Sequence, residues 1–103
     1  MKLYVAGPMS GYPEFNYQQF RAIAEVLRGC GYAVENPADN AKPDPETWEG
    51  YMRTALRQML TCEGVAVLHG WQESRGAAIE VDIAHKLGMP VLPWQVWYER
   101  PAA

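Results

Sequence analysis

One glutamate stands out among the residues that could do chemistry. Glu80 lies in the stretch 77–87, near the amino end of a segment whose apolar residues recur at helical spacing. The residues three, four and seven positions after it are all apolar: Ile83, Ala84 and Leu87. We therefore expect the Glu80 carboxylate on the helix face that packs against the rest of the protein, where an unpartnered charge is costly.

Two interpretations of Glu80 are open. In the first, it is a functional carboxylate, because a helix built only for packing would carry Leu or Ala at this position. In the second, it lies at the edge of the apolar face and pairs with an arginine such as Arg75 or Arg53. We favour the functional interpretation.

A second candidate is the loop Gly7-Pro8-Met9-Ser10-Gly11, which follows a short apolar run. Its glycine spacing matches neither a dinucleotide-binding pattern nor a phosphate-binding loop, so the motif is weak by itself. It could be an ordinary turn. It could also let a ligand approach the backbone, with Ser10 and free amide groups holding hydroxyl or phosphate oxygens.

A third group of candidates lies in the polar stretch 69–76, HGWQESRG. Trp71, like Tyr12 in the earlier loop, lies in a predicted loop and could stack on a base. His69 has no second His or Cys beside it, so it is more simply a polar loop residue, and we expect no metal site.

The elements that must position these residues alternate along the chain. Strands are expected over residues 2–6, 32–36, 64–68 and 89–92, and helices over about 16–29, 45–60 and 77–87. The alternation predicts an α/β fold: a three-layer, flavodoxin-like or Rossmann-like open parallel sheet with strand order 2-1-3-4 and helices on both faces. Ligands of such sheets bind at the carboxyl ends of the strands, beside the switch point, so loops 7–11 and 69–76 should meet there.

Local signals also predict where helices begin. Asn16 followed by Gln19 fits a capping box at the start of the first helix. Asp44 and Pro45 offer a capping residue and a first-turn proline for the second.

Composition narrows the class of protein. A chain of 103 residues has the length of one domain, which we assign to residues 1–103. A net charge of -3 without a basic run argues against duplex nucleic acid as a partner. Neither a signal peptide nor an apolar stretch of membrane-spanning length is present, so we expect a cytoplasmic protein without a membrane partner. Cys30 and Cys62 are expected to be free thiols.

Three stretches together resemble nucleoside 2-deoxyribosyltransferase-like proteins, especially small bacterial and phage members: YVAGPMSG, CEGVAVLHGW and SRGAAIEVDIAHKLGMPV. The resemblance runs from Tyr4 to about Leu92. Its most specific part is a glycine followed four residues later by a glutamate, which Gly76 and Glu80 match. The resemblance implies the same flavodoxin-like fold and no metal or redox cofactor.

It also implies a reaction. The Glu80 carboxylate would attack the anomeric carbon of a 2-deoxyribosyl group, the base would leave, and a second base or water would release the sugar. The substrate would be a deoxynucleoside or its 5′-monophosphate, and the protein a homo-oligomer. The residues expected to bind substrate are Tyr4, Gly7, Pro8, Met9, Ser10, Gly11, His69, Trp71, Ser74 and Gly76.

Two positions depart from the family pattern. Ala55 and Glu63 stand where family enzymes usually carry aspartate, and we expect Glu63 at the start of the third strand, away from the ligand. One alternative is therefore a catalytically inactive module that binds, senses or sequesters a nucleotide. A further alternative is an oligomer-forming protein, in which Trp94, Trp97 and Tyr98 expose an apolar surface as an interface.

Overall fold

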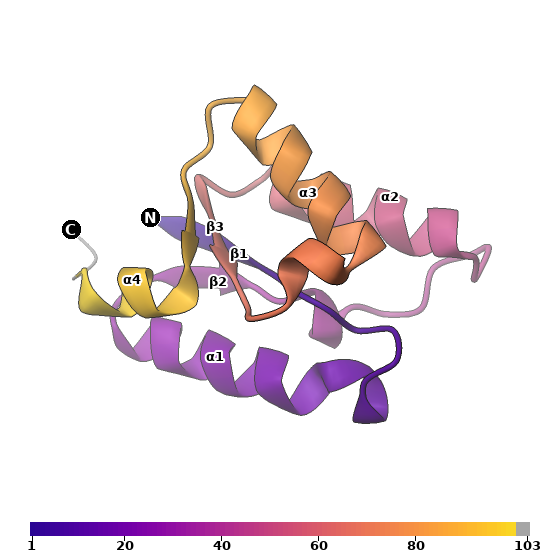
Figure 1. Cartoon of the computed structure of the whole chain (residues 1–103), viewed down its shortest axis with the longest axis horizontal. Coiled ribbons are helices and arrows are strands. Elements are labelled where there is room, and N and C mark those ends of the chain that lie inside the picture. The colour runs from indigo at the N-terminus through magenta and orange to yellow at the C-terminus, as the bar shows by residue number, and fades with distance from the viewer. Residues whose placement is uncertain (101–103) are drawn as a thin grey trace.

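A four-stranded parallel sheet forms the centre of the computed structural model, which describes residues 1–100 (Figure 1). The strands are β1 (Lys2–Ala6), β2 (Ala33–Glu35), β3 (Gly64–Val67) and β4 (Val91–Pro93). They lie in the order β2-β1-β3-β4, and every neighbouring pair is parallel. The predicted fold class and strand order are confirmed.

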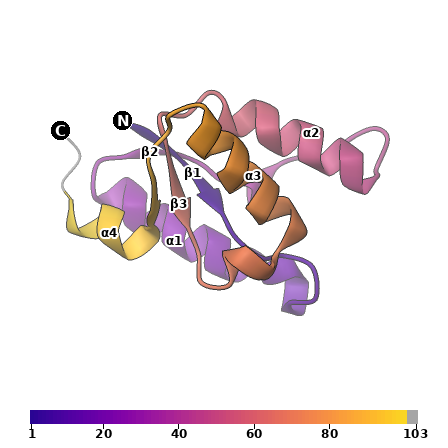
Figure 2. The ribbon, with the colours of Figure 1, turned by 45° about the horizontal axis from the view of Figure 1, so that its top comes forward.

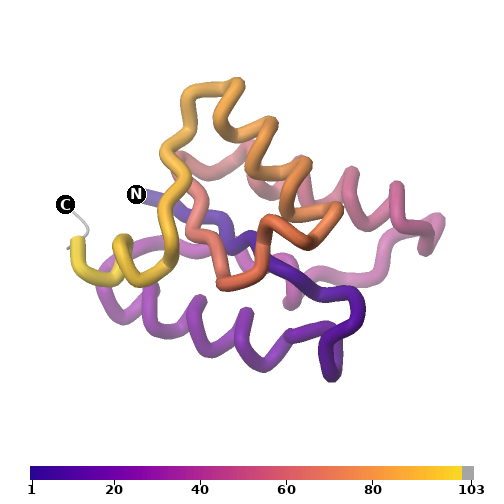
Figure 3. The backbone as a smooth tube through the Cα atoms, in the orientation of Figure 1, coloured from indigo at the N-terminus to yellow at the C-terminus, as the bar shows by residue number. Residues whose placement is uncertain are grey.

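Helices cover both faces of the sheet. One face carries α1 (Tyr17–Gly29) and α4 (Trp94–Glu99), and the other carries α2 (Trp48–Met59) and α3 (Arg75–Lys86) (Figures 1 and 2). Short 3-10 helices lie in the connections at Pro13–Asn16, Pro37–Asp39 and Trp71–Glu73. The tube in Figure 3 follows the chain through these crossovers.

The alternation of side chains along β1 divides the apolar residues between two cores. Leu3 and Val5 pack with α1 and α4, whereas Tyr4 and Ala6 pack with α2 and α3. All four residues of β3 are buried, as expected of a central strand covered on both faces.

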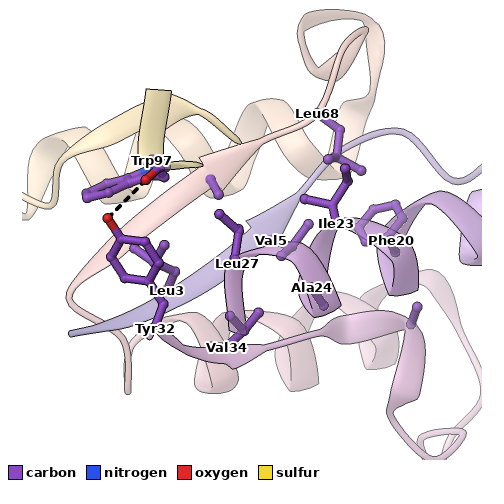
Figure 4. Packing of buried hydrophobic residues seen from close by; sticks show 12 residues of the cluster. Leu3, Val5, Phe20, Ile23, Ala24, Leu27, Tyr32, Val34, Leu68 and Trp97 are labelled. Carbon is purple, nitrogen blue, oxygen red and sulfur yellow. Dashed lines mark hydrogen bonds between the residues drawn. The ribbon is translucent and has the colours of Figure 1, made fainter. Parts of the chain in front are cut away.

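The core on the α1 side is drawn in Figure 4. Its helical contribution is the apolar face of α1: Phe20, Ile23, Ala24 and Leu27. Trp97 of α4 closes this core and is only 4% exposed, with its indole Nε1 donating to the Val65 carbonyl at 2.9 Å. The Tyr32 hydroxyl donates to the Trp97 carbonyl at 3.0 Å.

This packing corrects the prediction that the C-terminal tail exposes its aromatic residues together. Trp97 is buried because β3 begins with a glycine: a Cβ on Gly64 would lie 3.0 Å from the indole ring. Tyr98 remains 55% exposed. Helix α4, which contains Trp97, Tyr98 and the half-buried Trp94, was not expected from the sequence.

Two helix starts also differ from the prediction. Asn16 has a left-handed φ of 62° and makes no cap; instead its Nδ2 donates to the Pro8 carbonyl at 3.0 Å, and α1 begins at Tyr17. Thr47, rather than Asp44, caps α2, and its Oγ1 accepts from the Gly50 amide at 3.0 Å.

Helix α3 begins at Arg75, two residues earlier than expected, because Ser74 supplies its cap by accepting from the Ala77 amide at 3.3 Å. Both cysteines are free, with Cys62 buried. No helix among residues 1–100 combines the length and apolar character needed to cross a membrane.

Candidate functional site

A cleft of about 770 Å³ opens at the carboxyl end of β1. Its walls come from the end of β1 and the following loop, the start of α1, segment 37–47 between β2 and α2, and the amino-terminal parts of α2 and α3. The amino-terminal ends of these three helices lie on the same side of the molecule (Figure 1). The volume is typical of small-molecule sites, and the position is the edge at which parallel sheets bind ligands.

Glu80 and Tyr4 form a buried pair on one wall of this cleft. The Tyr4 hydroxyl donates to Glu80 Oε2 at 2.5 Å. Tyr4 is 1% exposed and Glu80 is 6% exposed, and both line the cleft. The strand alternation of β1 turns Tyr4 toward α3, and the helical spacing of α3 turns Glu80 toward the sheet. A carboxyl group is therefore held in a mostly apolar environment with an aromatic hydroxyl donating to it.

This environment changes the acidity of both groups. Burial raises the pKa of Glu80 from its ordinary 4.5 to about 7, while the hydrogen bond from Tyr4 acts in the opposite direction by stabilising the carboxylate. Burial, and secondly the charge of Glu80, raise the pKa of Tyr4 well above 10.0. Glu80 thus changes its ionisation near neutral pH, whereas Tyr4 stays a hydrogen-bond donor.

The alternative interpretation of Glu80, an edge residue paired with an arginine, is wrong. The ion pairs within residues 1–100 do not include Glu80. Arg75 instead places its guanidinium carbon 3.7 Å from the centroid of the Trp48 ring. Asp82, on the same helix, pairs with Lys86 at 2.9 Å on the exposed face.

The cleft brings together part of the predicted set. Seven of the predicted site residues line it: Tyr4, Gly7, Met9, Ser10, Ser74, Gly76 and Glu80. The remaining four do not line it: Pro8, Gly11, His69 and Trp71. Pro8 is buried and His69 is exposed. Trp71 packs against the core between the sheet and α3, so its ring is partly occupied by packing.

Packing restricts side chains at two of these positions, both of which are glycine. A Cβ on Gly7 would lie 2.7 Å from Leu68 Cβ, because the loop after β1 crosses the end of β3. A Cβ on Gly76 would lie 3.1 Å from Met52 Sδ, where α2 and α3 approach each other. Contact with a ligand is therefore not needed to explain Gly7, whereas at Gly76 the Met52 side chain would need to shift by only a few tenths of an ångström. Substrate binding by these residues stays a prediction.

A further part of the cleft lining was missed by the sequence predictions. It includes Trp48, Met52 and Thr54 of α2, together with segment 37–47. The only available signal was the Pro- and Asp-rich composition of residues 36–45, directly after the second strand and at the same edge of the sheet.

Only one of the two positions that depart from the family pattern lines the cleft. Ala55 lines the cleft, where its methyl group supplies neither a proton nor a hydrogen bond. Glu63 directly precedes β3 at the opposite end of the sheet, as predicted, where its Oε1 accepts from the Lys2 amide at 2.9 Å. Within residues 1–100, no three His, Cys, Asp or Glu side chains form a group that could hold a metal ion.

Comparison with known proteins agrees with this architecture. The family model described as "Domain of unknown function (DUF4406)" matches residues 1–93. No curated protein matches the chain. Among solved structures, a 2-deoxyribosyltransferase from the psychrotolerant bacterium Bacillus psychrosaccharolyticus is similar with a TM-score of 0.69 and 22% identity, over 88% of this chain and 69% of that chain. The resemblance noted in the sequence is thus confirmed at the level of the fold.

Proposed function

The chain belongs to the family described as a domain of unknown function, DUF4406, and we propose that its cleft cleaves the N-glycosidic bond of a deoxynucleoside or of a deoxynucleoside 5′-monophosphate. The base is released, and the 2-deoxyribosyl group passes to water or to a second base. A protein of the same fold that is named as a 2-deoxyribosyltransferase supports this reaction class.

The Glu80–Tyr4 pair is the observation that carries the proposal. A carboxyl group 6% exposed, with a tyrosine hydroxyl 2.5 Å away, lines a cleft large enough for a nucleoside. Burying such a group without an ion pair lowers stability, so a role in binding or chemistry accounts for its presence better than packing does.

In the proposed reaction Glu80 is the nucleophile. One carboxylate oxygen forms a bond to the anomeric carbon while the N-glycosidic bond breaks, and the electron pair of that bond leaves on the base nitrogen, which takes a proton from water in the open cleft. Water or a second base then attacks the anomeric carbon of the covalent glycosyl-enzyme, the bond from that carbon to the Glu80 oxygen breaks, and the proton lost by the attacking group passes to the solvent, which restores the Glu80 carboxylate. Tyr4 orients the carboxylate and stabilises its charge between these steps.

The raised pKa of Glu80 sets the pH dependence of this reaction. Only the ionised carboxylate attacks, so base release increases as the pH rises through about 7. The hydrogen bond from Tyr4 favours the ionised form and keeps the nucleophile available at neutral pH.

A binding module is the second candidate, and Ala55 is the observation that favours it. Ala55 lines the cleft and offers no group that could protonate a leaving base or hold a sugar hydroxyl. In this reading the cleft sequesters or senses a nucleotide without changing it.

One experiment separates the two candidates. The protein is incubated with common deoxynucleosides and their 5′-monophosphates, with and without an acceptor base, and free base, free sugar and new nucleoside are measured by chromatography. Glu80→Gln is expected to abolish product formation while keeping the fold, and Asp82→Asn, on the exposed face of α3, is expected to retain activity. Ligand-induced shifts in melting temperature without any product would favour the binding module instead.

The proposal keeps two expectations from the sequence: a cytoplasmic location, which follows from its composition, and a homo-oligomer, which the resemblance implies. Sedimentation velocity over a range of protein concentrations tests the second, and a monomer at all concentrations would contradict it.

A further inference from the structure

Helices α2 and α3 meet at their amino-terminal ends through two contacts, which we call the α2–α3 seam: Trp48 with Arg75, and Met52 with Gly76. The inner contact is tight, because the missing Cβ of Gly76 would lie 3.1 Å from Met52 Sδ. Gly76 and Glu80 are four residues apart on α3 and share one face of the helix. The seam therefore lies one turn beyond the buried carboxyl group, and its outer end is the Arg75–Trp48 stack.

The guanidinium group of Arg75 packs on an aromatic ring rather than pairing with a carboxylate. Its guanidinium carbon lies 3.7 Å from the centroid of the Trp48 ring, within the range of a cation–π contact. The ion pairs of residues 1–100 do not include Arg75. Arg75 itself is exposed, whereas Trp48 is half-buried and lines the cleft.

We propose that Arg75 is a positioning residue for the site: by stacking on Trp48 it holds the amino-terminal ends of α2 and α3 together and keeps this wall of the cleft closed beside Glu80. The inference rests on the proposed use of Glu80 by the site. Trp48, Met52, Gly76 and Glu80 all line the same cleft, so separating the two helices at the seam would admit water toward the carboxyl group.

The titration of Glu80 reports whether the seam is closed, because the groups around Glu80 leave its burial as the main influence on its pKa. From β1, Tyr4 faces Glu80 and donates to it. The charged side chains that line the same cleft are exposed and pair with each other: Arg21 with Asp39, and Lys42 with Glu46. The other titratable groups of the lining are Tyr17 and Tyr51, of which Tyr51 donates to Glu46. Burial is the largest cause of the raised pKa of Glu80, so opening the seam must lower it.

The test is a titration of Glu80 in Arg75→Ala, by carbon NMR of side-chain carboxyl groups in protein labelled at glutamate. The Glu80 signal is assigned as the one missing from Glu80→Gln. In the wild type its midpoint is expected at about 7. In Arg75→Ala we expect the midpoint to fall toward 4.5, and Arg53→Ala, which removes another exposed cation next to Met52, is expected to leave it unchanged.

A folded Arg75→Ala protein with the wild-type midpoint would overturn the proposal, since a role limited to general stability lowers the melting temperature without moving the titration. If Arg75→Ala does not fold, Trp48→Leu, which removes the ring and leaves the arginine, must show the same fall, and a wild-type midpoint there overturns it equally. Arg75→Lys keeps the cation without the planar group, and an intermediate midpoint is expected.

The outcome is independent of the proposed reaction. If neither the wild type nor any variant releases base but the Glu80 midpoint falls in Arg75→Ala, the proposed function is wrong and the inference about Arg75 still holds. If the wild type releases base and Arg75→Ala titrates normally, the seam inference fails alone. Where base release is observed, Arg75→Ala is expected to raise KM more than it lowers kcat, and its activity is expected to extend to lower pH.

Discussion

At the scale of single residues, the Glu80 carboxyl group is the feature that most affects both stability and chemistry. Its pKa is about 7 in the folded protein against an ordinary 4.5, so the folded state holds a proton that the unfolded chain has released between these values. The contribution of Glu80 to stability is therefore fully present below pH 4.5 and is lost as the pH rises to about 7. The difference between these two pKa values corresponds to a change of about 3 kcal/mol in the free energy of unfolding.

Replacing Glu80 with glutamine should remove this pH dependence of stability. Glu80→Gln keeps an acceptor for the Tyr4 hydroxyl but cannot ionise, so its stability relative to the wild type should increase between pH 5 and pH 8. Urea unfolding at several pH values measures it, with Asp82→Asn as the control on the exposed face. A constant difference between the variant and the wild type across this range would show that Glu80 is not protonated in the folded protein.

The second prediction concerns Tyr4→Phe, which removes the hydroxyl that donates to Glu80 but keeps the aromatic ring. The phenylalanine ring fills the same space, but the carboxylate loses the hydrogen bond that stabilises its charge, so the pKa of Glu80 should rise above 7. Loss of the hydrogen bond should cost about 1–2 kcal/mol. The NMR titration of Glu80 and, where base release is found, its pH profile give the measurement. A fall in the pKa would mean that the hydroxyl stabilises the protonated form instead.

Of the Glu80–Tyr4 pair, Glu80 could be singled out from the residue pattern of the sequence, whereas Tyr4 was predicted as a site residue from the family resemblance. Glu80 is recognisable because its neighbours at helical spacing are apolar. In the folded protein Ala84 is buried and Ile83 half-buried, whereas Leu87 lies just after the end of α3 and is 60% exposed. The stack of Arg75 on Trp48 had no such signal, because it joins the starts of two helices that are far apart in the chain. The sequence left Arg75 as a possible partner of Glu80, and the fold gives it an aromatic one.

At the scale of elements, the loop after β1 is fixed by its crossing over the end of β3. A Cβ at Gly7 would lie 2.7 Å from Leu68 Cβ, an atom that cannot move without the backbone. Gly7→Ala should therefore destabilise the protein by about 1–3 kcal/mol without any ligand present. Gly29→Ala, where a new Cβ meets nothing within 4 Å, should cause little loss. Equal stability of both variants in thermal unfolding would leave ligand contact as the reason for Gly7.

The strands could be predicted more accurately than the helix starts, for a physical reason. Alternating apolar strands and amphipathic helices in a short chain leave few topologies, and the 2-1-3-4 order follows from them. Helix caps depend on which polar side chain is free to turn back. Asn16 has a left-handed backbone and turns its Nδ2 to the Pro8 carbonyl, so it does not cap α1. Thr47 rather than Asp44 lies where it can reach the Gly50 amide.

At the scale of the whole molecule, α4 ties the end of the described chain to the middle of the sheet. Trp97 donates to the Val65 carbonyl and packs against Gly64, and Tyr32 donates to the Trp97 carbonyl. These contacts connect α4, β3 and the start of β2. We therefore expect α4 to unfold together with the rest of the protein.

Trp97→Phe tests this expectation. It removes the indole donor to the Val65 carbonyl and leaves a void beside Gly64, so the free energy of unfolding should fall by about 2–4 kcal/mol. Trp94→Phe, at a half-buried position of the same helix, is the control and should cost less. Urea unfolding followed by circular dichroism and by fluorescence should give coincident transitions. An early loss of fluorescence signal alone would mean that α4 detaches independently.

The cleft also belongs to this scale, which is why the sequence predicted only one side of it. Its position at the carboxyl edge follows from parallel topology alone. Its second wall, formed by segment 37–47 and the start of α2, depends on how a long connection folds back over the sheet. No local pattern encodes that path.

The alternation of side chains in β1 has a consequence for how the gene can change. Consecutive residues of this strand serve different faces, with Leu3 and Val5 in one core and Tyr4 beside Glu80 in the other. Deleting one codon within the strand would exchange the faces, placing an aliphatic side chain against the carboxyl group and the hydroxyl in the opposite core. A single substitution in β1 leaves the other side chains on their faces of the sheet. An insertion or deletion within β1 does so only when it changes the length by a multiple of two residues.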